Sequence, residues 1–282
     1  MKSLSIYILL IINFLFINGY GQDVAETYKL ATHLYELKQY KEASQLSHRV
    51  IYFADDSMLG YAYALKAECS FFLGDYENAA NEFHTAAQIC SEPLKNISFQ
   101  FSECISLLKI KRFLSGQELL LQLDTFTLSA EQKGQWYILM GTTFWLNGME
   151  DSSFYYFNSS LHTDSQKVDL ANIRIQAKKK LKLNPKRAEI LAALFPGLGH
   201  FYAGDVKGGL NSFILTIGLA SLAAKVAFTV GPLNAVMAVA PWYYRYYIGG
   251  TKNAAHVASQ KREARKELLY DQIISLTFDK TQ

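Results

Sequence analysis

The chain has 282 residues, of which half are hydrophobic, 14% are aromatic and 19% are charged. Disordered chains are poor in aromatic residues, so this composition excludes disorder, and the length predicts about two domains. Three cysteines without a C-x-x-C pair exclude a dense disulfide framework and the common zinc patterns. Residues 23–170 carry 11 basic and 19 acidic residues, whereas residues 174–270 carry 15 basic and 4 acidic residues. We therefore expect two units in different surroundings.

The first residues have the pattern of a secretory signal peptide. A single basic residue, Lys2, precedes an apolar run over residues 4–16, and the small residues Gly19 and Gly21 follow. The pattern predicts a signal peptide over residues 1–21, cleaved after Gly21. An uncleaved anchor helix is the alternative, because glycine is a weaker cleavage residue than alanine.

Residues 23–164 contain a helical repeat. The stretch Tyr40-Lys41-Glu42-Ala43 returns 36 residues later as Tyr76-Glu77-Asn78-Ala79. A period near 34 residues is typical of stacked helix pairs. The second copy resembles the tetratricopeptide repeat, in which a Gly-x-Tyr turn follows helix A and an Ala-x3-Phe-x2-Ala pattern marks helix B. The matching residues are Ala67, Gly74, Tyr76, Ala79, Phe83 and Ala86.

Three further copies match this pattern less completely. The third, over about residues 96–123, has Phe113 in the tyrosine place and Gly116 in the alanine place. The matches in the first and fourth copies are Ala31, Leu34, Tyr40 and Ala43, and Tyr137, Gly141, Phe144, Gly148 and Phe157, respectively. The resemblance implies an all-α fold, in which residues 22–165 form a short superhelix of four helix pairs. Small residues let the two helices of a pair approach, and at least about three pairs must stack to bury their apolar faces.

The same resemblance implies a protein or peptide partner. In the family, the concave face built by the A helices contacts peptides, and here these positions are rich in aromatic residues. An aromatic groove suits an extended or helical apolar segment. The expected partner-binding residues are Tyr28, Tyr35, Glu68, Phe72, Thr142 and Trp145. The alternative is that these aromatic side chains pack against neighbouring helices, as aromatic residues at a spacing of three to four commonly do.

The sequence contains no pattern of residues that indicates catalysis, a metal or a cofactor. The six histidines form no pair at helical ligand spacing, and no nucleophile or phosphate-loop motif occurs. We therefore expect a protein that is not an enzyme and binds no metal, cofactor or nucleic acid. The three cysteines fall in helical segments as small apolar residues, and a bridge between Cys69 and Cys104 is an open alternative.

The basic part of the chain has the pattern of a membrane region. A basic connecting helix is expected over residues 166–187, where its lysines can contact anionic lipid headgroups. Three apolar segments then follow within residues 188–250, namely Ala188–Tyr202, Gly209–Val230 and Pro232–Ile248, and a charged helical tail occupies residues 251–282. The second segment is long enough to cross a bilayer, and Gly231-Pro232 predicts a tight turn and a membrane-embedded helical hairpin. The first segment is too short and broken to assign as a span, a re-entrant loop or an interfacial helix. A buried hairpin of a soluble protein is the alternative for the whole region.

A glycine-rich stretch lies between the first two apolar segments. It resembles the Gly-x-Gly-x-His-x-Phe-Tyr-x-Gly type motif of the two-transmembrane-helix domain family, although here His, Phe and Tyr are contiguous. The motif residues are Pro196, Gly197, Gly199, His200, Phe201, Tyr202 and Gly204. The resemblance implies placement at a membrane, and its glycines are expected to allow a sharp turn or close helix packing.

Together these patterns predict a protein of the bacterial cell envelope, bound to the membrane, with its repeat domain in the periplasm. The expected function is a non-enzymatic, membrane-tethered scaffold that binds a protein through its repeats. The alternative is a membrane-active module, a pore or a transport accessory, built by the glycine-rich segment and the hairpin. Asn211 and Lys225 within the second apolar segment favour this alternative, because polar residues inside membranes are often functional.

Overall fold

The computed structural model describes residues 23–278, and the expected signal peptide lies outside this range. The described residues form helices and contain no strand, which confirms the all-α fold. The chain divides into two compact units, Met1–Ser160 and Leu161–Gln282. The first helix of the second unit begins at Asp164.

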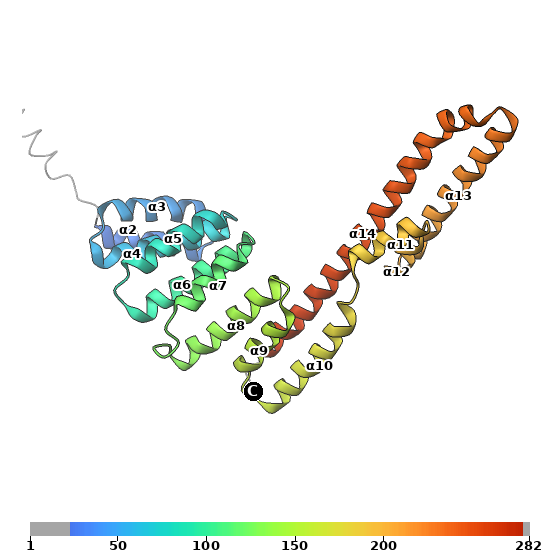
Figure 1. Ribbon diagram of the computed structural model, residues 1–282. Helices are drawn as coiled ribbons and strands as arrows, with labels where there is room; N and C mark the ends of the chain where they lie inside the picture. The colour runs from blue at the N-terminus through green and yellow to red at the C-terminus, as the bar shows by residue number, and fades with distance from the viewer. Residues whose placement is uncertain (1–22, 279–282) are drawn as a thin grey trace, which may run out of the picture. The chain divides into compact units, whose positions relative to one another are not determined.

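The first unit is a series of helices packed in consecutive pairs (Figure 1). Each helix contacts the next along the chain, as expected for a helical-repeat solenoid. The pairs are α2 (Val24–Glu36) with α3 (Tyr40–Phe53), α4 (Asp56–Phe72) with α5 (Tyr76–Ile89), α6 (Pro93–Lys109) with α7 (Phe113–Gln122), and α8 (Ala130–Leu146) with α9 (Glu150–Ser160).

The turns inside the four pairs have the same backbone geometry. Each places one residue at positive φ, namely Lys38 (61°), Gly74 (85°), Lys111 (63°) and Gly148 (81°). Each also has the same pair of closing hydrogen bonds; in the second pair, the amide of Gly74 donates to the Phe71 carbonyl and that of Asp75 to the Ser70 carbonyl. The third pair, whose sequence departs most from the pattern, therefore closes in the same way as the other three.

Small residues and aromatic rings form the core between the helices of the first unit. Ala67, Ala79 and Phe83 belong to one buried cluster that joins α4 and α5. A second cluster joins α6, α7 and α8, where the buried Trp136 indole donates a 2.8 Å hydrogen bond to the Leu120 carbonyl. These contacts stack successive pairs, as the small-residue pattern predicts.

The second unit contains α10 (Asp164–Lys180), α11 (Pro185–Leu194), α12 (Leu198–Tyr202), α13 (Val206–Thr229) and α14 (Pro232–Phe278). Helices α13 and α14 lie side by side and are joined at Gly231, so they form the expected hairpin (Figure 1). Helices α10, α11 and α12 pack against α14. The expected boundary between membrane region and tail, after residue 250, lies inside α14, which continues through Pro241 and Gly250 as one helix of 47 residues.

Candidate functional site

A groove in the first unit is lined by side chains from three A helices. Helix α2 contributes Tyr35, α4 contributes Glu68 and Phe72, and α6 contributes Ile105, around a cavity of about 240 Å³. The remaining lining residues are Phe71, Phe83 and Ser102. Phe72 is 54% exposed and Ile105 is 39% exposed, so the groove offers apolar surface to solvent.

Aromatic rings build one wall of this groove. Phe72 stacks on Tyr40 with the ring centroids 4.9 Å apart and the planes 11° apart, and the Tyr35 ring lies 6.0 Å from Phe72. Phe71 makes an edge contact with Tyr76 at 5.1 Å. Tyr40 and Tyr76 are the turn tyrosines of the repeat pattern, so these residues support the groove from the first turn of each B helix.

One carboxylate lies among these rings. Burial raises the pKa of Glu68, while a hydrogen bond from the Tyr35 phenol and the charge of Lys95 act in the opposite direction. Burial also raises the pKa of Tyr35, and the neighbouring charge of Glu68 raises it further. The groove thus combines apolar surface with one acidic group whose charge is partly shielded from water.

The structure brings together some of the residues expected at the partner site. Tyr35, Glu68 and Phe72 line the groove. Burial raises the pKa of Tyr28, and the charge of Glu68 adds to this effect, which places Tyr28 near the same carboxylate.

The two expected residues of the fourth repeat lie elsewhere. Trp145 is 1% exposed and makes an edge contact with Phe154 at 5.9 Å. Thr142 is 7% exposed, and its hydroxyl donates to the Ile138 carbonyl. Both side chains therefore belong to the core of the fourth pair, because α8 and α9 enclose them, and neither lines the groove. Ser102 and Ile105 also line the groove, and the repeat pattern does not predict them, because the third repeat matches the pattern too weakly to align its helix A.

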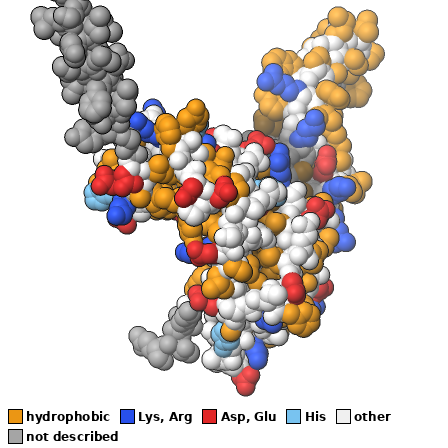
Figure 2. All heavy atoms as spheres, turned by 90° about the vertical axis from the view of Figure 1, so that its left-hand side faces the viewer, with side chains coloured by type: hydrophobic (Ala, Val, Ile, Leu, Met, Phe, Trp, Pro, Cys, Tyr) orange, Lys and Arg blue, Asp and Glu red, His pale blue; other side chains and the backbone are white. Residues whose placement is uncertain are grey.

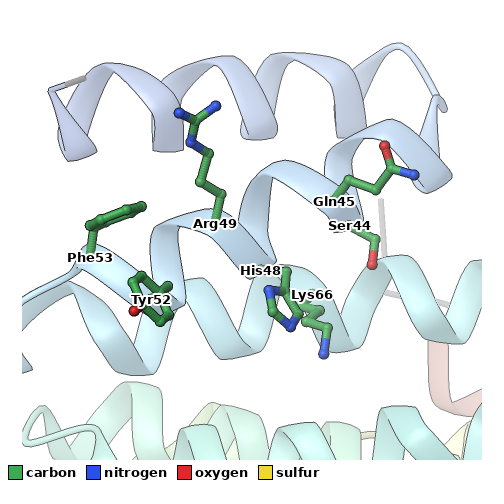
Figure 3. Close-up of a pocket in the computed structure, with 7 residues that line it drawn as sticks. All are labelled: Ser44, Gln45, His48, Arg49, Tyr52, Phe53 and Lys66. Carbon is green, nitrogen blue, oxygen red and sulfur yellow. The ribbon is translucent and has the colours of Figure 1, made fainter. Parts of the chain in front are cut away.

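A second pocket of about 550 Å³ lies over α3 and α4 (Figure 3). Tyr52 and Phe53 stand at one end, and His48 lies beside Lys66 nearer the middle (Figure 3). Lys66 pairs with Glu82 at 2.7 Å, so part of its charge is neutralised within the protein. The pocket is an open hollow between exposed side chains of α3, and it brings together no acid–base pair.

The glycines of the predicted membrane motif lie where backbones meet. Gly197, at a φ of 88°, precedes α12, and a Cβ there would lie 2.4 Å from the Gly209 carbonyl oxygen. A Cβ on Gly199 would lie 2.0 Å from the Ala188 carbonyl oxygen, and one on Gly209 would lie 2.6 Å from the Phe201 ring. Side chains at these positions would push α11, α12 and α13 apart.

The other motif residues fasten α12 to its neighbours. His200 is buried, and the Tyr202 hydroxyl accepts a 3.1 Å hydrogen bond from the Asn184 amide. The carbonyl of Gly204, together with that of Ala203, accepts from the Lys261 ammonium group on α14. The Phe201 ring lies against Gly209 of α13, and Pro196 precedes the Gly197 turn. The first apolar segment thus folds into two short helices, α11 and α12, neither of which is long enough to cross a bilayer.

Within the described residues, α13 is the one helix long and apolar enough to cross a membrane. Its most apolar window has a mean hydropathy of 1.7, and 6% of that window is buried. Figure 2 shows hydrophobic side chains gathered at the tip of the hairpin, where Phe228 is 92% exposed, Leu233 72% and Met237 71%.

Within the described residues, the three cysteines are unpaired and the possible metal ligands do not cluster. Cys69, Cys90 and Cys104 are free thiols. Burial raises the pKa of Cys69 and of Cys104 to about 12, and the carboxylate next to each thiol adds to the shift. Across residues 23–278, no three His, Cys, Asp or Glu side chains come together as a metal site.

Comparisons with known proteins give no assignment: neither a protein-family model nor a curated protein matches this chain.

Proposed function

We propose that this protein is a non-enzymatic, membrane-tethered scaffold whose first unit is tetratricopeptide-like and binds a segment of another protein. The observation that carries the proposal is the groove lined by Tyr35, Glu68, Phe72 and Ile105, which joins exposed apolar side chains with one carboxylate. Apolar anchors in a shaped groove supply most of the binding free energy in helical-repeat recognition, and a charged group adds orientation.

The groove favours a partner with a particular chemistry. Phe72 and Ile105 would contact apolar side chains, and Glu68 would accept a hydrogen bond from a lysine, an arginine or a backbone amide. We therefore infer that the partner segment carries apolar residues next to a basic one. An acidic residue at the same place would be repelled by the Glu68 carboxylate.

The membrane part of the proposal rests on the exposure of the hairpin. A helix with the composition of α13 would be buried in the core of a soluble protein, yet 6% of its apolar window is buried. The exposed Trp242 and Tyr244 on α14 are residues that favour the membrane–water interface. We propose that the hairpin inserts into lipid, and that residues 1–21 direct export to the bacterial envelope with the first unit in the periplasm.

Site-specific photocrosslinking in cells tests the groove. A photoreactive phenylalanine analogue at Ile105 should form an adduct with a defined protein, and the same analogue at the exposed Leu114 of α7 should not. Adding Phe72→Ala to the Ile105 variant should abolish the adduct. An adduct that survives Phe72→Ala, or that forms equally from Leu114, contradicts the proposal.

Membrane attachment and sidedness need a separate experiment. Reporter fusions after Asp169, Asp205 and Gln282 show on which side of the membrane each part of the chain lies. The proposal predicts that the fusion after Asp169 reports the periplasm. A full-length chain that remains in the soluble fraction would contradict membrane attachment.

A further inference from the structure

A cavity of about 430 Å³ with several polar side chains in its lining lies in the second unit, between the first half of α13 and the middle of α14. His200 of α12 and Gly208, Asn211 and Ser212 of α13 line one side. Arg245, Gly249 and Asn253 of α14 are among the residues that line the other. The cavity is open, since Asn211, Arg245 and Asn253 are exposed. Polar side chains on helices that meet lipid are costly in a membrane protein, and this makes them candidates for a binding site.

One basic side chain lines the cavity. Arg245 lines it, and no Asp or Glu is among its lining residues. Within residues 23–278, Arg245 makes no ion pair. The charge of Asp205 acts on His200, and the Asp205 carboxylate accepts a 3.0 Å hydrogen bond from the Gly208 amide and so caps α13.

His200 contributes a buried ring nitrogen that has no hydrogen-bond partner in the described part of the chain. The side chain is 1% exposed, and the Asn253 amide nitrogen lies 3.3 Å from its Nε2 atom. Because an amide nitrogen donates, Nε2 accepts this bond and the ring hydrogen is carried by Nδ1. The Nδ1 atom is buried and has no hydrogen-bond partner in the described part of the chain. A buried N–H group without a partner destabilises a protein unless a ligand or water accepts from it.

We propose that this cavity binds a phosphate group, carried by a phospholipid headgroup or free in solution. A phosphate presents several oxygens in a tetrahedral arrangement, and the guanidinium of Arg245, the hydroxyl of Ser212 and the side-chain amide of Asn211 offer donors from the two helices that line the cavity. Arg245 lies within the aromatic run Trp242–Tyr247, and such residues mark the level of lipid headgroups. Basic pockets between membrane helices bind headgroups for the same reason.

This inference rests on the membrane attachment proposed above and is independent of the partner groove in the first unit. Two glycines in the hairpin provide a matched pair of variants. A Cβ at Gly249, which lines the cavity, or at Gly218, which does not, would meet no atom within 4 Å. Leucine at either position should therefore be compatible with the helix, but only Gly249→Leu fills the cavity.

The experiment uses the full chain in detergent. Native mass spectrometry measures binding of a short-chain phosphatidylglycerol and of the matching diacylglycerol, which lacks the phosphate, and calorimetry measures binding of inorganic phosphate. We expect the phosphatidylglycerol to bind and the diacylglycerol not to bind. Arg245→Gln and Gly249→Leu should weaken binding at least tenfold, whereas Gly218→Leu and the charge-matched Lys225→Gln should stay within about twofold of wild type.

The outcomes distinguish a lipid headgroup from free phosphate. They also distinguish failure of the cavity proposal from failure of the proposed membrane attachment. Binding of both lipid and inorganic phosphate supports a site for the phosphate group itself, and binding of the lipid alone supports a headgroup site. Equal retention of the diacylglycerol, or equal effects of Arg245→Gln and Lys225→Gln, overturns the inference. Recovery of the full-length chain in the soluble fraction would instead remove the membrane part of the proposed function, while the calorimetric result with inorganic phosphate would still decide whether the cavity takes phosphate.

Discussion

The ring of Phe157 on α9 fills the space beside Gly141 on α8, so that a Cβ at Gly141 would lie 2.8 Å from two ring carbons. Phe157 has no exposed surface and therefore has no free direction in which to move. A larger residue at position 141 would overlap the Phe157 ring, which explains why the repeat pattern has a small residue there.

Replacing this glycine should destabilise the first unit. We expect Gly141→Ala to lower the free energy of unfolding by about 1–3 kcal/mol, because the added methyl group overpacks the core. Gly134→Ala in the same helix is the control, since its Cβ meets no atom within 4 Å, and the higher helix propensity should stabilise by up to about 1 kcal/mol. Denaturant unfolding followed by the fluorescence of Trp136 and Trp145 measures both changes. Equal effects of the two variants would contradict this account.

The turn residues of the four pairs predict a stabilising substitution. Lys111 adopts a φ of 63°, the conformation that Gly148 adopts in the next pair at 81°. A side chain in this region costs about 1 kcal/mol, so Lys111→Gly should raise the free energy of unfolding by about that amount. Lys109→Gly, which places glycine in the last turn of α6 instead, should lower it. If Lys111→Gly also lowers the stability, the left-handed geometry is not the dominant strain at this turn.

The buried carboxylate in the groove predicts a dependence of stability on pH. Burial raises the pKa of Glu68 in the folded chain above its ordinary value of 4.5. Between the pKa of the unfolded chain and that of the folded chain, the folded chain therefore holds more protons than the unfolded chain. The free energy of unfolding therefore falls as the pH rises through this window. Glu68→Gln should remove this loss, so that the variant gains stability relative to wild type as the pH rises above 4.5.

A second variant separates this effect from other titrating groups. Tyr35→Phe removes the phenol that donates to Glu68, and this hydrogen bond lowers the pKa of the carboxyl. The pH-dependent loss of stability should then become steeper than in wild type. Thermal unfolding at a series of pH values measures all three profiles. Parallel profiles for wild type and Glu68→Gln would show that Glu68 titrates normally in the folded chain.

The thiols should differ strongly in reactivity. A thiol with a pKa of about 12, as for Cys69 and Cys104, is a thiolate in roughly one molecule in ten thousand at pH 8. Cys90 is partly exposed, whereas the other two are fully buried. We expect iodoacetamide to modify Cys90 at least about 100-fold faster, as measured by peptide mass spectrometry. Denaturation should abolish the difference, and a disulfide between Cys69 and Cys104 would appear as two thiols that remain unmodified until reduction.

The sequence predicts the helical repeats better than it predicts the residues of the groove. The 36-residue spacing of Tyr40 and Tyr76 predicts helix pairs, because turn closure and the approach of small residues depend on contacts close in the chain. The third pair forms although its sequence matches weakly, since Lys111 takes the left-handed turn that glycine takes elsewhere. Trp145 is an exception to the repeat pattern. Its position in the repeat predicts a groove residue, yet packing against Phe154 encloses its side chain.

By itself, the sequence determined that the chain is helical, that its first part is built from pairs, and that α13 is apolar enough for lipid. These properties follow from local periodicity, turn residues and hydropathy. Only the tertiary structure decided that Ile105 joins Tyr35 and Glu68 in one groove, and that His200 and Arg245 line one cavity. Residues far apart in the chain meet only where helices pack, and which face of each helix is covered depends on the neighbours that bury it.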